Sequence, residues 1–137
     1  MQVVLDASLL VALVLREPHA ERIESLIRRW DAEGAVLNAP LLIHYEVASA
    51  LTRHRATGGF SAEDAAEALA VIDDLGIVFH TPSDLARTIE LAVDLQRHSA
   101  YDAAYLALAE RIDGEVWTLD GPLARNAADR YRVTLID

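Results

Sequence analysis

Residues 101–120 read YDAAYLALAERIDGEVWTLD, a helical pattern followed by a turn and a strand. The Ala- and Leu-rich part favours a helix over Tyr101–Arg111, and the Asp-Gly pair after it is typical of a turn. About ten helical residues rise roughly 15 Å, and the strand that ends at Asp120 returns roughly 17 Å. Asp120 is therefore predicted to come back to the level of Asp102, at one edge of a sheet.

Short apolar runs alternate with longer helical patterns along the rest of the chain, which is typical of a sheet covered by helices. Strands are expected at Gln2–Leu5, Ala35–Asn38, Gly76–Phe79, Glu115–Leu119 and Val133–Ile136. Helices are expected at Ser8–Leu15, Ala20–Asp31, Leu42–Thr57, Ala62–Leu75, Ser83–Arg97, Tyr101–Arg111 and Pro122–Tyr131. The pattern predicts a single α/β domain over residues 1–137, without a linker or an internal repeat.

The composition limits the class of protein. The chain has 137 residues, of which 53% are hydrophobic and 25% are charged, and this suits one folded domain with a substantial core. It contains no Cys, which excludes disulfides, thiolate catalysis and Cys-based zinc sites. All 12 basic residues are Arg, and the absence of Lys excludes a Walker phosphate-binding loop and Schiff-base chemistry.

The formal net charge is -10, which argues against a general nucleic-acid binder that relies on a basic patch. A nuclease is not excluded, because several of these negative charges would belong to a metal site. The apolar segment near the amino terminus has no basic start, is interrupted by Asp6 and is far shorter than a membrane span. We therefore expect a soluble, cytoplasmic protein with no membrane segment.

The candidate site consists of four carboxylates, those of Asp6, Glu46, Asp102 and Asp120. Asp6 and Asp120 each follow a predicted strand, at the edge where open parallel sheets bind ligands. Glu46 lies in the first half of its predicted helix, and Arg53 shares its face. Carboxylates about 4 Å apart repel by about 4 kcal/mol at an effective dielectric constant of about 20, so a cluster requires a cation. An all-oxygen site without Cys suits Mg²⁺ or Mn²⁺ better than zinc.

Each acid, taken alone, also has a structural explanation. Asp6 could cap the following helix, Asp102 could complete a capping box, and Asp120 could belong to a turn. An exposed Glu in a helix, such as Glu46, is common. The functional interpretation therefore depends on the four acids acting together.

Other polar residues lie beside the acids in the sequence. Ser8 and Thr118 could hold metal-bound water behind the metal ligands, although a Thr in a strand is ordinary. Tyr101 and Tyr105 are expected to pack within the Ala-rich helix rather than to stack on a base.

Four segments of the chain, taken in order, carry a resemblance to a known family. They are Asp6-Ala7-Ser8 after the first strand, Pro40 followed by Glu46, the DAAYLALA segment that starts at Asp102, and Thr118-Leu119-Asp120. Together they resemble the PIN-domain ribonucleases and, more narrowly, the VapC toxins of toxin–antitoxin pairs. The resemblance spans nearly the whole chain and implies a PIN-like three-layer α/β/α domain with a mainly parallel central sheet of about five strands.

In that family these acidic positions are the metal ligands. The resemblance therefore implies that Asp6, Glu46, Asp102 and Asp120 are catalytic and hold Mg²⁺, with Mn²⁺ as a possible substitute. The polar residues that follow the last Asp in the family pattern are replaced here by Gly-Pro, so we carry over no further ligand. A contribution from Asn126 stays open.

The resemblance implies a metal-dependent endoribonuclease that hydrolyses RNA phosphodiester bonds, with single-stranded loops as targets. It also implies a homodimer and a VapB-like antitoxin that inserts an Arg against the acids. The residues chosen as candidates for contacts to the RNA backbone, because they lie near acidic motifs in the sequence, are Arg53, Arg55, Arg97 and Arg125.

Two other classes of protein share features with this pattern. A receiver-type phosphoacceptor domain also gathers Asp residues at strand ends, but it requires a Lys that this chain lacks. A PIN-like module that binds RNA or protein without cutting would have the same fold, and the sequence leaves this alternative open.

Overall fold

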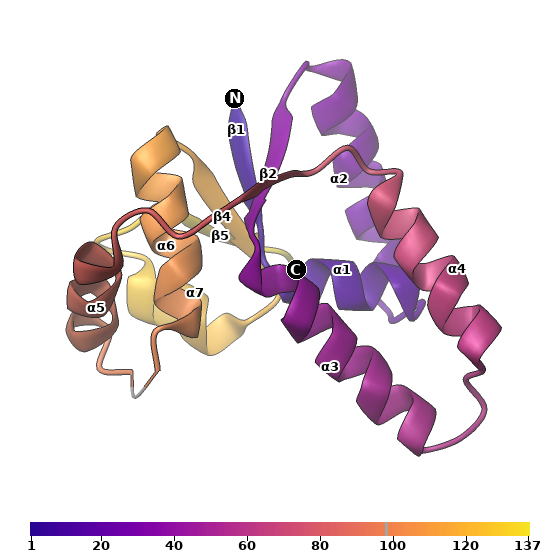
Figure 1. Cartoon of the computed structure of the whole chain (residues 1–137). Helices are drawn as coiled ribbons and strands as arrows, with labels where there is room; N and C mark the ends of the chain where they lie inside the picture. Colours follow the sequence, from indigo (N-terminus) through magenta and orange to yellow (C-terminus); the bar gives the residue numbers. More distant parts are fainter. Residues whose placement is uncertain (98) are drawn as a thin grey trace.

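A computed structural model describes residues 1–97 and 99–137, and within them one parallel sheet of five strands has the order β3-β2-β1-β4-β5 (Figure 1). The strands are β1 (Gln2–Leu5), β2 (Val36–Pro40), β3 (Val78–His80), β4 (Glu115–Thr118) and β5 (Val133–Leu135). The helices are α1 (Ala7–Val14), α2 (Ala20–Ala32), α3 (Leu42–Ala56), α4 (Ala62–Asp73), α5 (Leu85–Asp94), α6 (Tyr101–Ile112) and α7 (Gly121–Ala127).

The helices form a layer on each side of the sheet. Helices α5, α6 and α7 lie on one side, and α1, α2, α3 and α4 lie on the other (Figure 1). On the first side α6 packs across β1, β2 and β4, while on the second α1 contacts α2, α3 and α4. The expected three-layer α/β/α architecture and the parallel sheet are confirmed.

The central strand β1 is buried on both faces. Val3, Val4 and Leu5 are fully buried, as expected for an apolar run in a parallel sheet that is covered on both sides. Its register with β4 pairs Leu5 with Trp117. The residues that follow these two positions, Asp6 and Thr118, therefore lie side by side at the carboxyl edge of the sheet.

The turn between α6 and β4 brings the chain back toward β1. Asp113 adopts the left-handed conformation, with φ of 54°, and ends α6. A Cβ atom on Gly114 would lie 2.9 Å from the Gln2 carbonyl oxygen, so only Gly allows β4 to start this close to β1. The predicted turn is confirmed, and the close approach explains the residue type at its second position.

The expected strands and helices are all present, but several ends were wrong. Strand β2 continues to Pro40, which pairs in register with His80. Helix α5 begins at Leu85 rather than at Ser83, because the Asp84 side chain accepts a hydrogen bond from the Arg87 N–H at 3.0 Å and caps the helix there. Helix α5 also ends at Asp94 rather than at Arg97, and α7 ends at Ala127 rather than at Tyr131. Within the described ranges, no helix has the length and apolar character needed to cross a membrane.

Replacement of Trp30 by Ala tests the packing of α2 against the sheet. The Trp30 ring is fully buried and meets the Trp117 ring edge-on, with centroids 5.1 Å apart and an interplanar angle of 72°. We expect Trp30→Ala to lower the free energy of unfolding by about 3–5 kcal/mol in urea titrations. Leu69→Ala, at a side chain on α4 that is 47% exposed, is the control and should change it by less than about 0.5 kcal/mol. Equal losses in the two variants would contradict this account of the core.

Candidate active site

Asp6 lies at the carboxyl edge of the sheet directly after β1, with 8% of its surface exposed. Its backbone occupies the N-cap position of α1, but its side chain makes no capping hydrogen bond. Oδ2 of Asp6 instead accepts hydrogen bonds from the hydroxyls of Ser8 and Thr118, each at 2.7 Å. The capping explanation for Asp6 is therefore wrong, and two hydroxyl groups orient this carboxylate.

The hydroxyls of Ser8 and Thr118 also hold the segment after β4. Thr118 Oγ1 accepts a hydrogen bond from the Asp120 N–H at 2.9 Å, and Ser8 Oγ accepts one from the Leu119 N–H at 3.0 Å. Each hydroxyl therefore donates to Asp6 and accepts from the backbone. The structure shows them joining the end of β1 to the end of β4. That they could also hold metal-bound water stays a prediction.

Asp120 is the N-cap of α7. Its Oδ1 accepts a hydrogen bond from the Leu123 N–H at 3.0 Å, so one oxygen of this carboxylate has a structural role. The Arg125 side chain lies directly over the next residue, since a Cβ atom on Gly121 would lie 2.8 Å from Nη1 of Arg125. Asp120 thus caps a helix while it remains beside Thr118, and the structural and functional interpretations are compatible at this position.

Glu46 lies in the second turn of α3 and is held from α6. Its Oε1 accepts a hydrogen bond of 2.6 Å from the Tyr105 hydroxyl, and the Tyr105 side chain is 1% exposed. Burial and the neighbouring Glu46 carboxylate raise the pKa of Tyr105, so the phenol keeps the proton that it donates. The packing prediction for Tyr105 is correct but incomplete. Its position three residues after Asp102, on the same helix face, was the available signal.

Asp102 is the second residue of α6 and is half-buried. The helix begins after Ala100 without a side-chain capping hydrogen bond, so the predicted capping box is wrong. Oδ2 of Asp102 lies 3.6 Å from Nε of Arg97, an ion pair rather than a hydrogen bond. Tyr101 is 62% exposed, because it starts the helix and faces away from the core, and the prediction that it packs inside is also wrong.

The four carboxylates interact electrostatically. Burial raises the pKa of Glu46 above its usual value, the charges of Asp6 and Asp102 raise it further, and the Tyr105 hydrogen bond lowers it. Burial also raises the pKa of Asp102, the Arg97 guanidinium opposes this, and the charges of Asp6 and Asp120 add to the rise. The fold therefore places negative charges near one another in partly desolvated positions, where a cation stabilises their ionised forms.

The donor set can be compared with the needs of a metal ion. In the described residues, no three His, Asp or Glu side chains lie close enough together to enclose an ion, since each acid is turned toward its own partner. The chemistry nevertheless fits Mg²⁺ or Mn²⁺, because these ions prefer carboxylate oxygens. They also retain several bound waters, so the carboxylates around them can lie farther apart than ligands that all bind the ion directly. Asp6, Glu46, Asp102 and Asp120 are the residues that could hold such an ion.

The candidate Arg residues have different surroundings. Arg53 lines a hollow of about 360 Å³ together with Glu46 and Asp120, so its predicted place on the Glu46 face is confirmed. Arg97 pairs with Asp102, and Arg125 lies over Gly121. The other two predicted polar residues point elsewhere: Arg55 donates to the Phe60 carbonyl at 3.4 Å, and Asn126 Nδ2 donates to the Leu95 carbonyl at 2.8 Å.

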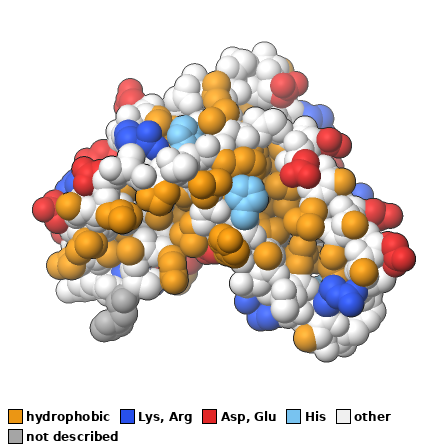
Figure 2. Space-filling view, in the orientation of Figure 1, with side chains coloured by type: hydrophobic (Ala, Val, Ile, Leu, Met, Phe, Trp, Pro, Cys, Tyr) orange, Lys and Arg blue, Asp and Glu red, His pale blue; other side chains and the backbone are white. Residues whose placement is uncertain are grey.

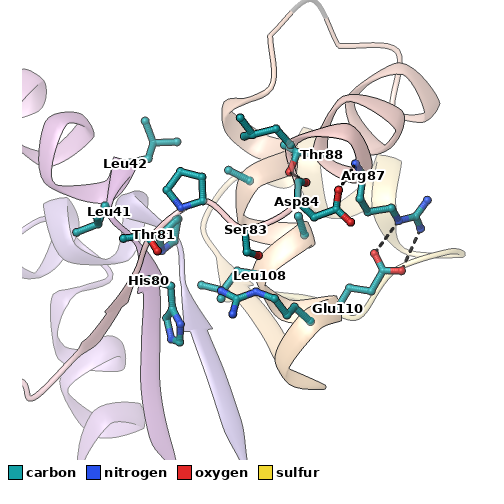
Figure 3. A pocket seen from close by; sticks show the side chains of 16 residues that line it. Leu41, Leu42, His80, Thr81, Ser83, Asp84, Arg87, Thr88, Leu108 and Glu110 are labelled. Carbon is teal, nitrogen blue, oxygen red and sulfur yellow. Dashed lines mark hydrogen bonds and ion pairs between the residues drawn. The ribbon is translucent and has the colours of Figure 1, made fainter.

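A separate hollow of about 460 Å³ lies between the start of α3, the segment after β3 and helices α5 and α6 (Figure 3). None of the four acids lines it. Two of its charged groups are paired in Figure 3, where Arg87 Nε and Nη2 donate to Glu110 at 3.0 and 3.1 Å. His80 likewise faces Asn38, with Nε2 2.8 Å from Oδ1. Because these polar groups satisfy one another, this hollow offers less chemistry than the acid cluster.

The architecture and the acid cluster define a class of protein. Residues 3–129 match the family model of the PIN domain, and the chain belongs to this family. Ribonuclease VapC3 of Pyrobaculum aerophilum is 33% identical over 90% of this chain and 93% of its own length. The crystal structure of PAE2754 from Pyrobaculum aerophilum shares the fold, with a TM-score of 0.71 and 22% identity over 92% of this chain and 79% of that one. The resemblance to PIN-domain and VapC proteins is confirmed.

Replacement of Thr118 by Val tests the hydroxyl pair that orients Asp6. Val has nearly the same shape, but it removes the donor to Asp6 and leaves the Asp120 N–H without its acceptor. We expect Thr118→Val to lower the free energy of unfolding by about 1–3 kcal/mol in urea at pH 7 with EDTA present. Thr118→Ser keeps the hydroxyl and should retain more of the stability. If Thr118→Ser loses as much as Thr118→Val, packing of the methyl group is decisive and the hydroxyl is not.

Neutralising Glu46 tests the electrostatic account. The pKa of Glu46 is raised in the folded state, so at a pH above that pKa the ionised carboxylate lowers the free energy of unfolding. This loss of stability is absent once the pH falls below the usual pKa of a Glu carboxyl, about 4.3, because the group is then protonated in both states. We expect Glu46→Gln to raise the free energy of unfolding at pH 7 in EDTA. The gain should disappear at about pH 4, as followed by urea titrations across this range. A less stable variant at pH 7 would show that the Tyr105 hydrogen bond to the ionised carboxylate outweighs burial.

Proposed function

We propose that this chain is an Mg²⁺-dependent endoribonuclease, with Mn²⁺ as a substitute, that hydrolyses RNA phosphodiester bonds. The observation that carries the proposal is the approach of four partly desolvated carboxylates at the carboxyl edge of a PIN-domain sheet. The name of the relative ribonuclease VapC3 supports RNA as the substrate. Asp6, Glu46, Asp102 and Asp120 are proposed as the metal ligands.

The proposed mechanism assigns separate roles to the metal ion and to the side chains that orient its ligands. When bound, Mg²⁺ supplies positive charge for the scissile phosphate and lowers the pKa of the attacking water. The hydroxyls of Ser8 and Thr118 keep Asp6 in one orientation, and the Tyr105 hydroxyl does the same for Glu46. Hydrolysis breaks the bond between phosphorus and the 3′-oxygen and leaves 5′-phosphate and 3′-hydroxyl ends.

Arg side chains are proposed to bind the RNA backbone around this cluster. Arg53 is exposed beside Glu46, and Arg125 is exposed beside Asp120, so both can reach phosphates that flank the scissile bond. Arg97 forms an ion pair with Asp102, so its guanidinium stabilises that carboxylate before it is available to a phosphate. Arg55 lies in the last turn of α3 and donates to the Phe60 carbonyl beyond the helix, so it is the weakest of the four candidates. Single-stranded loops are the proposed targets, because an unpaired backbone can bend into the site.

We further propose that the protein is the toxin of a VapBC-type pair in the cytoplasm. The support is its similarity to a protein named VapC3 and the cluster of partly buried acids, which suits a guanidinium from a VapB-like antitoxin. Asp102 already forms an ion pair with a guanidinium of the chain itself, that of Arg97. The toxin is proposed to form a homodimer or a toxin–antitoxin hetero-oligomer.

The alternative is a PIN-like module that binds RNA or protein without cutting. The experiment that separates the two uses end-labelled RNA with Mg²⁺ or Mn²⁺, with and without EDTA. We expect cleavage by the wild type to stop in EDTA, and Asp102→Asn to reduce it roughly 100-fold or more, because a metal ligand and its charge are lost. The matched control is Asp113→Asn, since the Asp113 side chain is 97% exposed and lies at the opposite end of α6.

Cleavage that persists unchanged in EDTA, or in the Asp102→Asn variant, would overturn the proposal. The same pair of variants tests the toxin role. Expression without a partner should arrest growth for the wild type and for Asp113→Asn, and it should spare cells that express Asp102→Asn. Growth unaffected by an RNA-cleaving wild type would remove the support for a toxin while leaving the nuclease in place.

A further inference from the structure

Two exposed Tyr side chains stand beside the proposed metal ligands. Tyr45 directly precedes Glu46 in α3, and Tyr101 directly precedes Asp102 in α6. Tyr45 is 77% exposed and Tyr101 is 62% exposed. Aromatic rings gain most when they are covered, so two exposed rings from different helices beside one site indicate that something packs against them.

Both rings line one hollow of about 450 Å³. Its other lining residues are Leu42, Glu46, Ser49 and Arg53, all on one face of α3. The hollow therefore opens between α3 and the first turn of α6, where Figure 2 shows a notch in the surface. Its volume admits a planar group as large as a nucleobase.

This hollow adjoins the acid cluster at Glu46. Glu46 and Arg53 line it and also line the neighbouring hollow of about 360 Å³, which reaches Ser8 and Asp120. A polymer with one phosphate at the acids can therefore place a neighbouring residue beside the two Tyr rings. The hollow is thus an extension of the proposed catalytic cleft rather than a remote surface.

The charge of the hollow also favours a nucleotide. Within the described part of the chain, no carboxylate lies within ion-pair distance of the Arg53 guanidinium. A free guanidinium beside two aromatic faces matches a unit that has both a phosphate and a flat ring. A purely apolar partner would leave Arg53 and Ser49 unsatisfied.

We propose that Tyr45 and Tyr101 form a stacking subsite for one unpaired base of the RNA substrate, next to the scissile phosphate, with Arg53 on the adjoining phosphate. The proposal rests on the ribonuclease function and specifies how that site holds single-stranded RNA. Stacking on Tyr tolerates any base, so this subsite selects for unpaired RNA rather than for a sequence.

The test compares Tyr45→Ala and Tyr101→Ala with Tyr45→Phe and Tyr101→Phe, which keep the ring and remove only the hydroxyl. We expect each Ala variant to raise KM for a labelled single-stranded RNA by about 5- to 150-fold, the range produced by losing one stacked base. The value of kcat should change little, and the Phe variants should resemble the wild type. Fluorescence anisotropy in an Asp102→Asn background, where the RNA stays intact, should show weaker RNA binding for the Ala variants and unchanged binding for the Phe variants.

An abasic substrate identifies the base that stacks. RNAs that lack one base, at each position near the cut in turn, should bind the Asp102→Asn protein more weakly at one position only, and the Tyr variant is compared in the same background. Tyr101→Ala should be less sensitive to that loss, because the base then keeps only Tyr45, as a double-mutant cycle requires for groups in contact. Full sensitivity in the variant would overturn the proposal.

Size-exclusion chromatography with light scattering is run on every variant. An Ala variant that changes its oligomeric state together with its RNA affinity would overturn the proposal, because the rings would then belong to a contact with a second copy of the chain. Normal cleavage with an unchanged KM overturns the stacking subsite alone. A wild type that cleaves no RNA overturns the ribonuclease function, and the subsite falls with it.

Discussion

The hydrogen bond from the Asp6 N–H to the Trp117 carbonyl, 3.1 Å long, extends the pairing of β1 with β4 beyond the last residue of β1. This bond sets the ends of the two strands level, so the Thr118 hydroxyl meets the Asp6 carboxylate and the Asp120 N–H. A shift of one residue in the register would send the Thr118 side chain to the opposite face of the sheet. The geometry of the acids therefore depends on backbone pairing in the core, and the surface loops contribute less.

The charge of the site imposes a second constraint. Each of the four acids has a separate partner: two hydroxyls for Asp6, the Tyr105 phenol for Glu46, Arg97 for Asp102 and a helix N–H for Asp120. Arg97 alone among these partners carries a full positive charge. The remaining repulsion is what a divalent cation would neutralise, and this explains how a chain with net charge -10 could approach a polyanion.

Much of the fold follows from patterns that are local in the sequence. Apolar runs of strand length alternate with helical periods, and this was enough to predict each strand and helix. The ends were less predictable, because they depend on single hydrogen bonds such as the cap that Asp84 gives to α5. The placement of Asp120 near Asp102 followed from the lengths of one helix and one strand, because these nearly cancel. The Tyr105–Glu46 hydrogen bond joins residues 59 positions apart, and no local pattern encodes such a contact.

The two Trp residues of the chain pack against each other, and they connect the core to the site. Indole rings at 5.1 Å and 72° have coupled electronic transitions, so their near-ultraviolet circular dichroism depends on their relative orientation. Trp117 directly precedes Thr118 on β4, and its carbonyl is bound by the Asp6 N–H. The protein thus contains an intrinsic optical probe whose signal is tied to the strand that carries the acid cluster, with no attached label.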